Sequence, residues 1–185
     1  MPTVFIAGSI TIKHLDPKAK ERINKAVEAG LDVVVGDADG ADSAIQRHLQ
    51  DLSAKRVTVY CSGSQPRNNI GSWPVHHVTS NHAPGSRSFY TAKDVEMAQT
   101  ADYGLMIWDT KSTGTLSNVI ELLTRKKKSV VYIHRDKDFK TVADVAHLES
   151  LVAGMSDHAR QKADEKIQLS ARIAALVREQ PRLFA

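Results

Sequence analysis

The sequence ADYGLMIWDTKSTGTLSNVIE, residues 101–121, contains an apolar run, a short polar loop and the start of a periodic segment. Residues 103–108 are almost all apolar, which is typical of a strand buried on both faces of a sheet. After the loop, apolar residues recur with the spacing of an amphipathic helix. The free N–H groups of such a helix start form a natural anion site. The stretch therefore predicts either a binding site around Ser112, Gly114 and Thr115 or an ordinary turn with a Ser/Thr cap.

The same alternation of strand and helix continues on both sides of this unit. Apolar runs at residues 3–6, 31–35, 57–61 and 129–133 predict further buried strands, and helical periodicity separates the first three. This order favours a parallel sheet with right-handed crossovers. We expect a doubly wound, Rossmann-like α/β fold. Its mainly parallel sheet would have five strands or slightly more, with helices on both faces and two helices at the C-terminal end.

Two regions have less regular patterns. Residues 62–87 are rich in Gly and Pro, and predict a long functional or mobile loop with a short strand at 75–78. The loop contains His76, His77 and His82, but no acidic or cysteine partner at ligand spacing, so we expect no metal. From Phe139 onward the pattern is helical. We therefore expect residues 1–137 to form the Rossmann-like domain and residues 138–185 to form a helical extension of it.

Composition narrows the classes of partner. Lys and Arg number 25 and Asp and Glu 21, a net charge of +4 that permits phosphate binding without demanding it. The basic run at residues 125–128 ends a predicted helix, where the helix dipole favours cations. It lacks interleaved aromatic residues for base stacking, so we do not expect a nucleic-acid partner. There is one cysteine and no apolar run long enough to span a membrane, so we expect a cytoplasmic protein without a membrane partner.

Polar turns follow three of the predicted strands, at Gly8-Ser9, residues 36–42 and residues 109–115. Ligands of doubly wound sheets bind outside the carboxyl ends of the strands, so these turns should line one site. Gly36 and Gly40 should leave room for a ligand. The candidate ligand-binding residues are Gly8, Ser9, Gly36, Asp37, Gly40, Ala41, Asp42, Arg87, Lys93, Ser112, Gly114, Thr115 and Asn118.

Roles within this set follow from side-chain chemistry. Asp37 and Asp42 suit sugar hydroxyls, a base edge or a metal-bridged phosphate, whereas we expect Asp39 to cap the following helix. Arg87 and Lys93 could meet phosphate oxygens. Lys93 and Asp94 could instead form a solvated surface pair. Neither G-x-G-x-x-G nor G-x-x-x-x-G-K-[ST] occurs, so we expect no cofactor of the ordinary dinucleotide or P-loop type.

Three of these features together resemble the SLOG superfamily: Ala7-Gly8-Ser9, residues 36–42 and Gly114-Thr115. This Rossmann-like group includes the DprA/Smf DNA-processing proteins and the "lonely guy" phosphoribohydrolases, and the resemblance covers residues 3–133. It implies a nucleoside phosphate or ADP-ribose-like ligand at the edge of the sheet, and a homo-oligomer. The phosphoribohydrolases cleave the N-glycosidic bond of nucleoside 5′-monophosphates.

The hydrolase motifs are only partly kept. Where those enzymes have Arg-Lys-x-x-Met, this chain has Lys93-Asp94-Val95-Glu96-Met97, and Asn118 stands at the position of their catalytic glutamate. Asparagine cannot act as a general acid or base. If cleavage occurs, Asp94 or Asp109 would have to supply the carboxylate. We therefore prefer nucleotide binding, and keep N-glycoside hydrolysis and DNA binding as alternatives.

Overall fold

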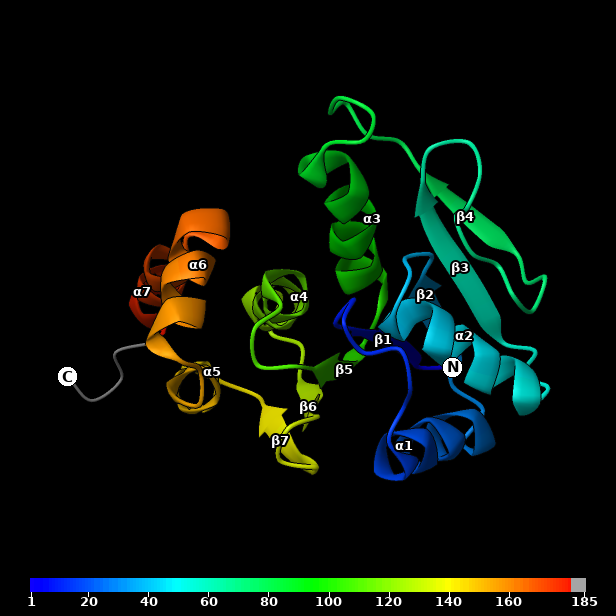
Figure 1. Cartoon of the computed structure of the whole chain (residues 1–185), viewed down its shortest axis with the longest axis horizontal. Helices are drawn as coiled ribbons and strands as arrows, with labels where there is room; N and C mark the ends of the chain where they lie inside the picture. Colours follow the sequence, from blue (N-terminus) through cyan, green and yellow to red (C-terminus); the bar gives the residue numbers. More distant parts are fainter. Residues whose placement is uncertain (181–185) are drawn as a thin grey trace.

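The computed structural model describes residues 1–180, and these form one seven-stranded sheet with helices on both faces (Figure 1). The strand order is β4-β3-β2-β1-β5-β6-β7. The first six strands are parallel, and β7 pairs antiparallel with β6. The strands are β1 (Thr3–Gly8), β2 (Asp32–Gly36), β3 (Val57–Ser62), β4 (Val75–Val78), β5 (Tyr103–Trp108), β6 (Ser129–Ile133) and β7 (Asp138–Val142).

Two apolar cores separate the helices into layers. One joins the sheet to α3, α4 and the C-terminal helices α5–α7, and the other joins it to α1 and α2. The helices are α1 (Pro17–Glu28), α2 (Ala41–Asp51), α3 (Arg87–Thr100), α4 (Thr113–Thr124), α5 (Val145–Ala153), α6 (Asp157–Ile167) and α7 (Leu169–Glu179). This arrangement confirms the doubly wound, mainly parallel α/β fold.

Local sequence signals explain where several elements begin and end. Asp16 caps α1, where its carboxylate accepts a hydrogen bond from the amide of Lys18 at 2.9 Å, and Pro17 occupies the first helical turn. Gly30 follows α1 with a φ of 73°, a conformation that suits glycine. Ser156 caps α6 by accepting from the amide of Ala159 at 3.1 Å. The predicted short strand at residues 75–78 is also present as β4.

The C-terminal part differs from the prediction in two places. Residues 138–142 form β7 rather than the start of a helix; in this edge strand only Val142 is buried, so no alternating apolar pattern marks it. The predicted last helix is divided into α6 and α7 by Gln168, which has the left-handed conformation (φ 51°, ψ 50°). Because glutamine does not signal this conformation as glycine does, the break is invisible in the sequence. Three helices therefore replace the two expected.

Within residues 1–180, none of the helices combines the length and the apolar character that crossing a membrane requires.

Candidate functional site

Ser9 brings the three polar turns together at the carboxyl ends of the strands. Its side chain is fully buried, and its carbonyl oxygen accepts a hydrogen bond from the amide of Ala41 at 3.3 Å. Its hydroxyl accepts from the amide of Asp109 at 3.0 Å and lies 3.3 Å from the hydroxyl of Thr115. The turns after β1, β2 and β5 thus meet at one edge of the sheet, as the parallel order requires.

The glycines of the second turn allow close packing rather than ligand access. A Cβ atom on Gly36 would lie 2.5 Å from a carboxylate oxygen of Asp42. A Cβ atom on Gly40, which has a φ of 77°, would lie 2.1 Å from the carbonyl oxygen of Ile10. The expectation that Gly36 and Gly40 leave room for a ligand is therefore corrected, because protein atoms fill that space.

Gly8 and Gly114 differ in the same respect. A Cβ atom on Gly8 would lie 2.7 Å from the Cβ atom of Ala41, so Gly8 lets α2 approach β1 closely. A Cβ atom on Gly114 would meet no heavy atom within 4 Å. Of the four glycines predicted at the site, Gly114 alone opens onto free space.

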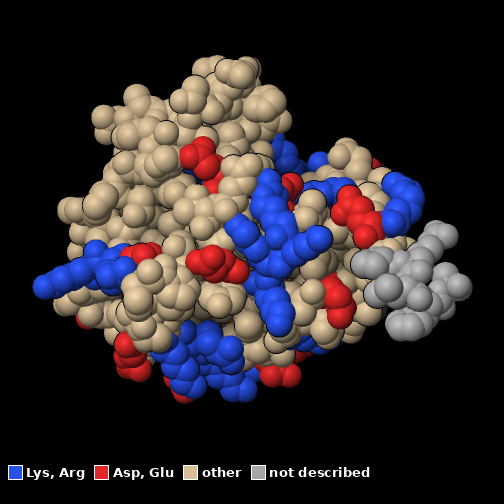
Figure 2. Space-filling model, turned by 180° about the vertical axis from the view of Figure 1, so that it is seen from behind, with Lys and Arg blue, Asp and Glu red and all other residues tan. Residues whose placement is uncertain are grey.

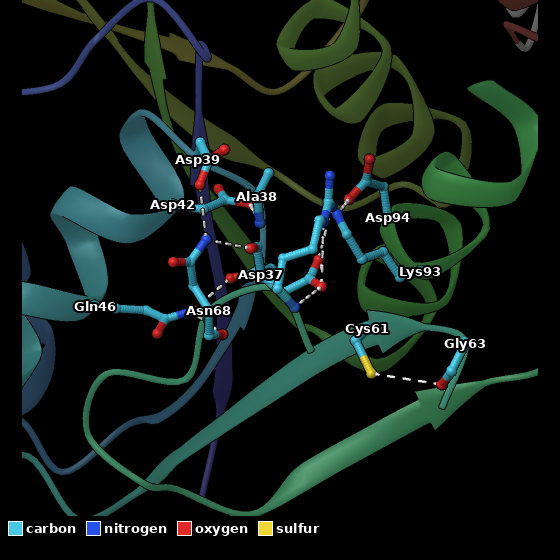
Figure 3. Close-up of polar contacts among 12 residues, drawn as sticks. Asp37, Ala38, Asp39, Asp42, Gln46, Cys61, Gly63, Asn68, Lys93 and Asp94 are labelled. Carbon is cyan, nitrogen blue, oxygen red and sulfur yellow. Dashed lines mark hydrogen bonds and ion pairs between the residues drawn. The ribbon is translucent and has the colours of Figure 1, made fainter. Parts of the chain in front are cut away.

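Figure 3 shows the three aspartates of the acidic turn, of which Asp37 and Asp42 are buried and Asp39 is exposed. Asp37 is 2% exposed and accepts hydrogen bonds from Arg67, at 2.8 Å from the guanidinium and 2.9 Å from the backbone amide. Asp39 does not cap α2, because Gly40 holds the N-cap position; its carboxylate instead accepts from the side chain of Asn68 at 3.0 Å. Arg67 and Asn68 lie in the irregular segment after β3, where no periodicity could have indicated their role.

Lys93 occupies the centre of a buried charge cluster beneath this turn. Its side chain is almost fully buried, and its ammonium group donates to the carboxylate of Asp94 at 2.8 Å (Figure 3). Burial by itself would lower the pKa of Lys93, but the charges of Asp94 and Asp42 raise it. Burial raises the pKa of Asp42 to about 7, against the opposing charge of Lys93. Lys93 and Asp94 are therefore not the solvated surface pair that the sequence left open.

A crevice of about 340 Å³ lies between α3, α4 and the junction of α6 with α7. Figure 1 shows α4 between these elements, with α3 on one side and α6 and α7 on the other. We call it the α3–α4 crevice. The polar and glycine residues that line it include Arg87, Asp94, Gly114, Asn118, Lys166 and Arg172.

The first turn of α4 is open toward this crevice. Ser112 holds the N-cap position, but its side chain makes no capping hydrogen bond. Arg87 reaches across from α3 and donates to the hydroxyl of Thr113 at 2.8 Å. Uncapped amides at a helix N-terminus attract anions, and a guanidinium beside them adds a fork-shaped donor.

Asn118, one turn further along α4, also lines the crevice. The residue is 6% exposed, and its side chain forms no hydrogen bond within residues 1–180. Its amide atoms are not fully enclosed by protein, so the amide reaches the space of the crevice. It is therefore free to form a hydrogen bond with an anion or a polar ligand there.

Asp109 has a different surrounding from Asp94, the other predicted catalytic carboxylate. It accepts hydrogen bonds from the amides of Lys111 at 2.8 Å and Ser112 at 2.6 Å, and from the hydroxyl of Thr11 at 2.7 Å. Burial would raise the pKa of Asp109, but these donors lower it overall. The carboxylate is thus engaged in shaping the loop, whereas the carboxylate of Asp94 faces the crevice.

A second cavity of about 570 Å³ adjoins the other side of the first turn of α4. Its lining includes three lysines, from the loop after β5 and from α6: Lys111, Lys162 and Lys166. We call it the lysine cavity. The sequence analysis did not identify three of the cations that line the two cavities, because the pattern of the C-terminal helices indicates only an apolar packing face. They are Lys162, Lys166 and Arg172.

The histidines of the irregular segment lie apart from both cavities. His76 pairs with Glu96 and stacks on Tyr60, and His77 lies 3.4 Å from the sulfur of Cys61. Burial raises the pKa of the Cys61 thiol. Among the residues that the structure describes, no three His, Cys, Asp or Glu side chains are grouped as a metal site would require.

The fold is shared with a protein of solved structure. No protein-family model matches the chain, and comparison with curated proteins gives no significant match. Among solved structures, the chain is similar to DNA processing protein A from Helicobacter pylori, which was described for its single-stranded DNA binding mode. The TM-score is 0.55 at 18% identity, over 97% of this chain and 82% of that chain.

At this identity the likeness shows the fold alone. It agrees with the Rossmann-like class that the sequence motifs resemble, since DNA-processing proteins are part of that superfamily. Because the matched protein binds single-stranded DNA, the expectation that a nucleic-acid partner is unlikely is corrected.

Proposed function

We propose that this chain binds a phosphate group of a nucleotide in the α3–α4 crevice, at the N-terminus of α4. The observation that carries the proposal is the open first turn of α4 at Gly114, which has no side-chain cap and has the free amide of Asn118 beside it in the crevice lining. A phosphate oxygen can accept hydrogen bonds both from that amide and from the free N–H groups of the helix. Neither an apolar ligand nor a cation would satisfy these donors.

The charges around the crevice favour an anion. Asp94 is neutralised by Lys93, and Glu121 pairs with Arg125 and Arg172. Within residues 1–180, Arg87 and Lys166 pair with no carboxylate and line the crevice. The field at the first turn of α4 is therefore positive, which favours phosphate over a neutral sugar or base.

A nucleoside phosphate or an ADP-ribose-like molecule agrees with the size of the crevice, since small-molecule sites have volumes of roughly 300–1,000 Å³. Asp37 and Asp42, which we expected near the sugar, are turned toward Arg67 and Lys93. The sugar would instead lie along α3, where Thr91 and Asp94 line the crevice.

Thermal unfolding with and without 5′-AMP or ADP-ribose tests this proposal. A ligand at 100 times its Kd stabilises the folded state by about 2.7 kcal/mol, which raises the Tm by several degrees. In Gly114→Val the side chain would fill the space of the phosphate, and the ligand-induced shift should vanish. Gly154→Val, at the end of α5, is the matched control and should keep the shift. An unchanged shift in Gly114→Val would reject the site.

Asn118→Leu gives an independent test. An apolar side chain of similar size removes the amide donor from the crevice, so the ligand-induced shift should be reduced while the Tm without ligand stays close to that of the wild type. A destabilised Asn118→Leu with full ligand response would mean that Asn118 has a structural role only.

Single-stranded DNA is a second candidate, favoured by two observations. The lysines of the lysine cavity extend the positive surface beyond the crevice, and the similar solved protein binds single-stranded DNA. Binding through phosphates should weaken steeply with salt. N-glycoside hydrolysis stays a hypothesis that depends on Asp94, whose carboxylate faces the crevice. Release of free base from nucleoside monophosphates, lost in Asp94→Asn, would support it.

A further inference from the structure

We infer that the lysine cavity is a second phosphate subsite, so that the ligand carries two phosphate groups, one on each side of the first turn of α4. This inference rests on the proposed phosphate site in the α3–α4 crevice, and it narrows the ligand class. The common chemistry is a nucleoside that carries phosphate on both its 5′ and 3′ oxygens. A small nucleotide and a single strand of nucleic acid both have it.

The two cavities are neighbours. Ser112 and Thr113 line the lysine cavity, Gly114 lines the α3–α4 crevice, and Lys166 of α6 lines both. Neighbouring residues of the first turn of α4 therefore face the lysine cavity on one side and the α3–α4 crevice on the other. When the amides at Gly114 bind one phosphate of a ligand, the rest of that ligand can extend past Lys166 into the lysine cavity.

The second cavity has an excess of positive charge, because three lysines line it against the one carboxylate of Asp109. Within residues 1–180, Lys111, Lys162 and Lys166 form no ion pair, although they line the same concave surface. Asp109 is the carboxylate in the lining, and hydrogen bonds from Thr11 and two backbone amides already engage it. Three like charges around one hollow repel each other, and an anion between them removes that repulsion.

An apolar residue lines the same cavity and suits the remainder of a nucleotide. Ile10 is 62% exposed, an unusual exposure for isoleucine, and it lines the cavity together with Ala159. The sugar that joins the two phosphates, or the base attached to that sugar, would cover this side chain. The cavity thus combines phosphate donors with an apolar wall, which an inorganic ion would not need.

The experiment measures affinities of the full chain for 5′-AMP, adenosine 3′,5′-bisphosphate and a ten-nucleotide deoxyadenosine strand by titration calorimetry. We expect the bisphosphate to bind about tenfold more tightly than 5′-AMP, the size of effect expected for two exposed charge pairs. Lys111→Gln/Lys162→Gln should abolish this preference. Lys126→Gln/Lys128→Gln, which removes two cations beyond the end of α4, is the matched control and should retain it.

The outcomes separate this inference from the proposed function. Equal affinity for 5′-AMP and the bisphosphate overturns the second subsite while the first phosphate site stands. A preference that survives in Lys111→Gln/Lys162→Gln also overturns it, because the extra phosphate then lies elsewhere. If none of the three probes binds, the proposed function fails and the inference fails with it. A preference that the lysine variant removes supports the subsite, and comparison of the strand with the bisphosphate then identifies the source of the ligand.

Discussion

The carboxyl group of Asp42 shows how strongly the interior changes a single residue. The side chain is 6% exposed and lies close to Lys93 and Asp94 beneath the second turn. The sequence places it in an acidic loop, where three aspartates look alike. In the structure Asp37 binds Arg67, Asp39 is exposed and binds Asn68, and burial raises the pKa of Asp42 to about 7.

This shift predicts a pH dependence of stability. The folded-state pKa of Asp42 lies above its ordinary value of 3.8, so the folded protein binds the proton more tightly than the unfolded chain. The resulting stabilisation is complete below pH 3.8 and is lost as the pH rises to about 7. The loss is at most about 1.4 kcal/mol per pH unit.

Asp42→Asn removes the titrating group, so the Tm of this variant minus that of the wild type should be more positive at pH 8 than at pH 5. Thermal unfolding at the two pH values measures the difference. Asp39→Asn is the control and should show the same Tm difference at both. A Tm difference for Asp42→Asn that does not change with pH would contradict the raised pKa.

At the scale of elements, the basic run at residues 125–128 supports a different helix from the one we expected. The sequence places these cations at the end of α4, and Arg125 is indeed its C-cap residue. Lys127, however, donates to the carbonyl oxygen of Ala98 at 2.9 Å and also to that of Gln99. It therefore satisfies the last carbonyls of α3, the neighbouring helix, where a cation is favoured by the dipole.

Lys127→Ala should lower the free energy of unfolding by about 1 kcal/mol, because two helix-end carbonyls lose their donor. Urea denaturation measures the change. Lys128→Ala removes a neighbouring exposed charge without that contact and should be close to neutral. If both variants lowered the free energy of unfolding equally, the stabilisation by these cations would come from general electrostatics and not from the contact of Lys127 with α3.

At the scale of the whole molecule, positive charge is not confined to the two cavities. Figure 2, which views the molecule from behind, shows Lys and Arg gathered in the middle of that face with Asp and Glu around them. The four consecutive cations at residues 125–128 follow α4 at the end away from its open first turn. The run at residues 125–128 is therefore a second basic surface, separate from the lysine cavity, and variants of the two surfaces can be compared.

If single-stranded DNA follows the two cavities, Lys111→Gln/Lys162→Gln should reduce the slope of log affinity against log salt by about 1.4, since each phosphate contact to a single strand contributes about 0.7. Lys126→Gln/Lys128→Gln should leave the slope unchanged. Fluorescence anisotropy with a labelled oligonucleotide at several salt concentrations measures both. The opposite pattern would place the strand on the other basic surface.

The sequence by itself determined the fold class and the edge of the sheet where the polar turns meet. Buried parallel strands are continuous apolar runs, and helices between them are periodic, so both appear in local patterns. Gly114 was predicted as a site residue from the strand-to-helix unit, and Asn118 from its position in the family resemblance. Both line the α3–α4 crevice, because they follow β5 along a single helix.

Only the tertiary structure decided which of the candidate groups remain free. Asp42 occupies the space beside Gly36, and Ile10 occupies the space beside Gly40. The carboxylate of Asp37 forms an ion pair with Arg67, which lies in a segment without periodicity. Lys166 and Arg172 reach the crevice from helices whose sequence shows only an apolar stripe. Whether a polar group is free or already forms a hydrogen bond or ion pair depends on contacts between residues far apart in the chain. Local sequence patterns do not predict such contacts.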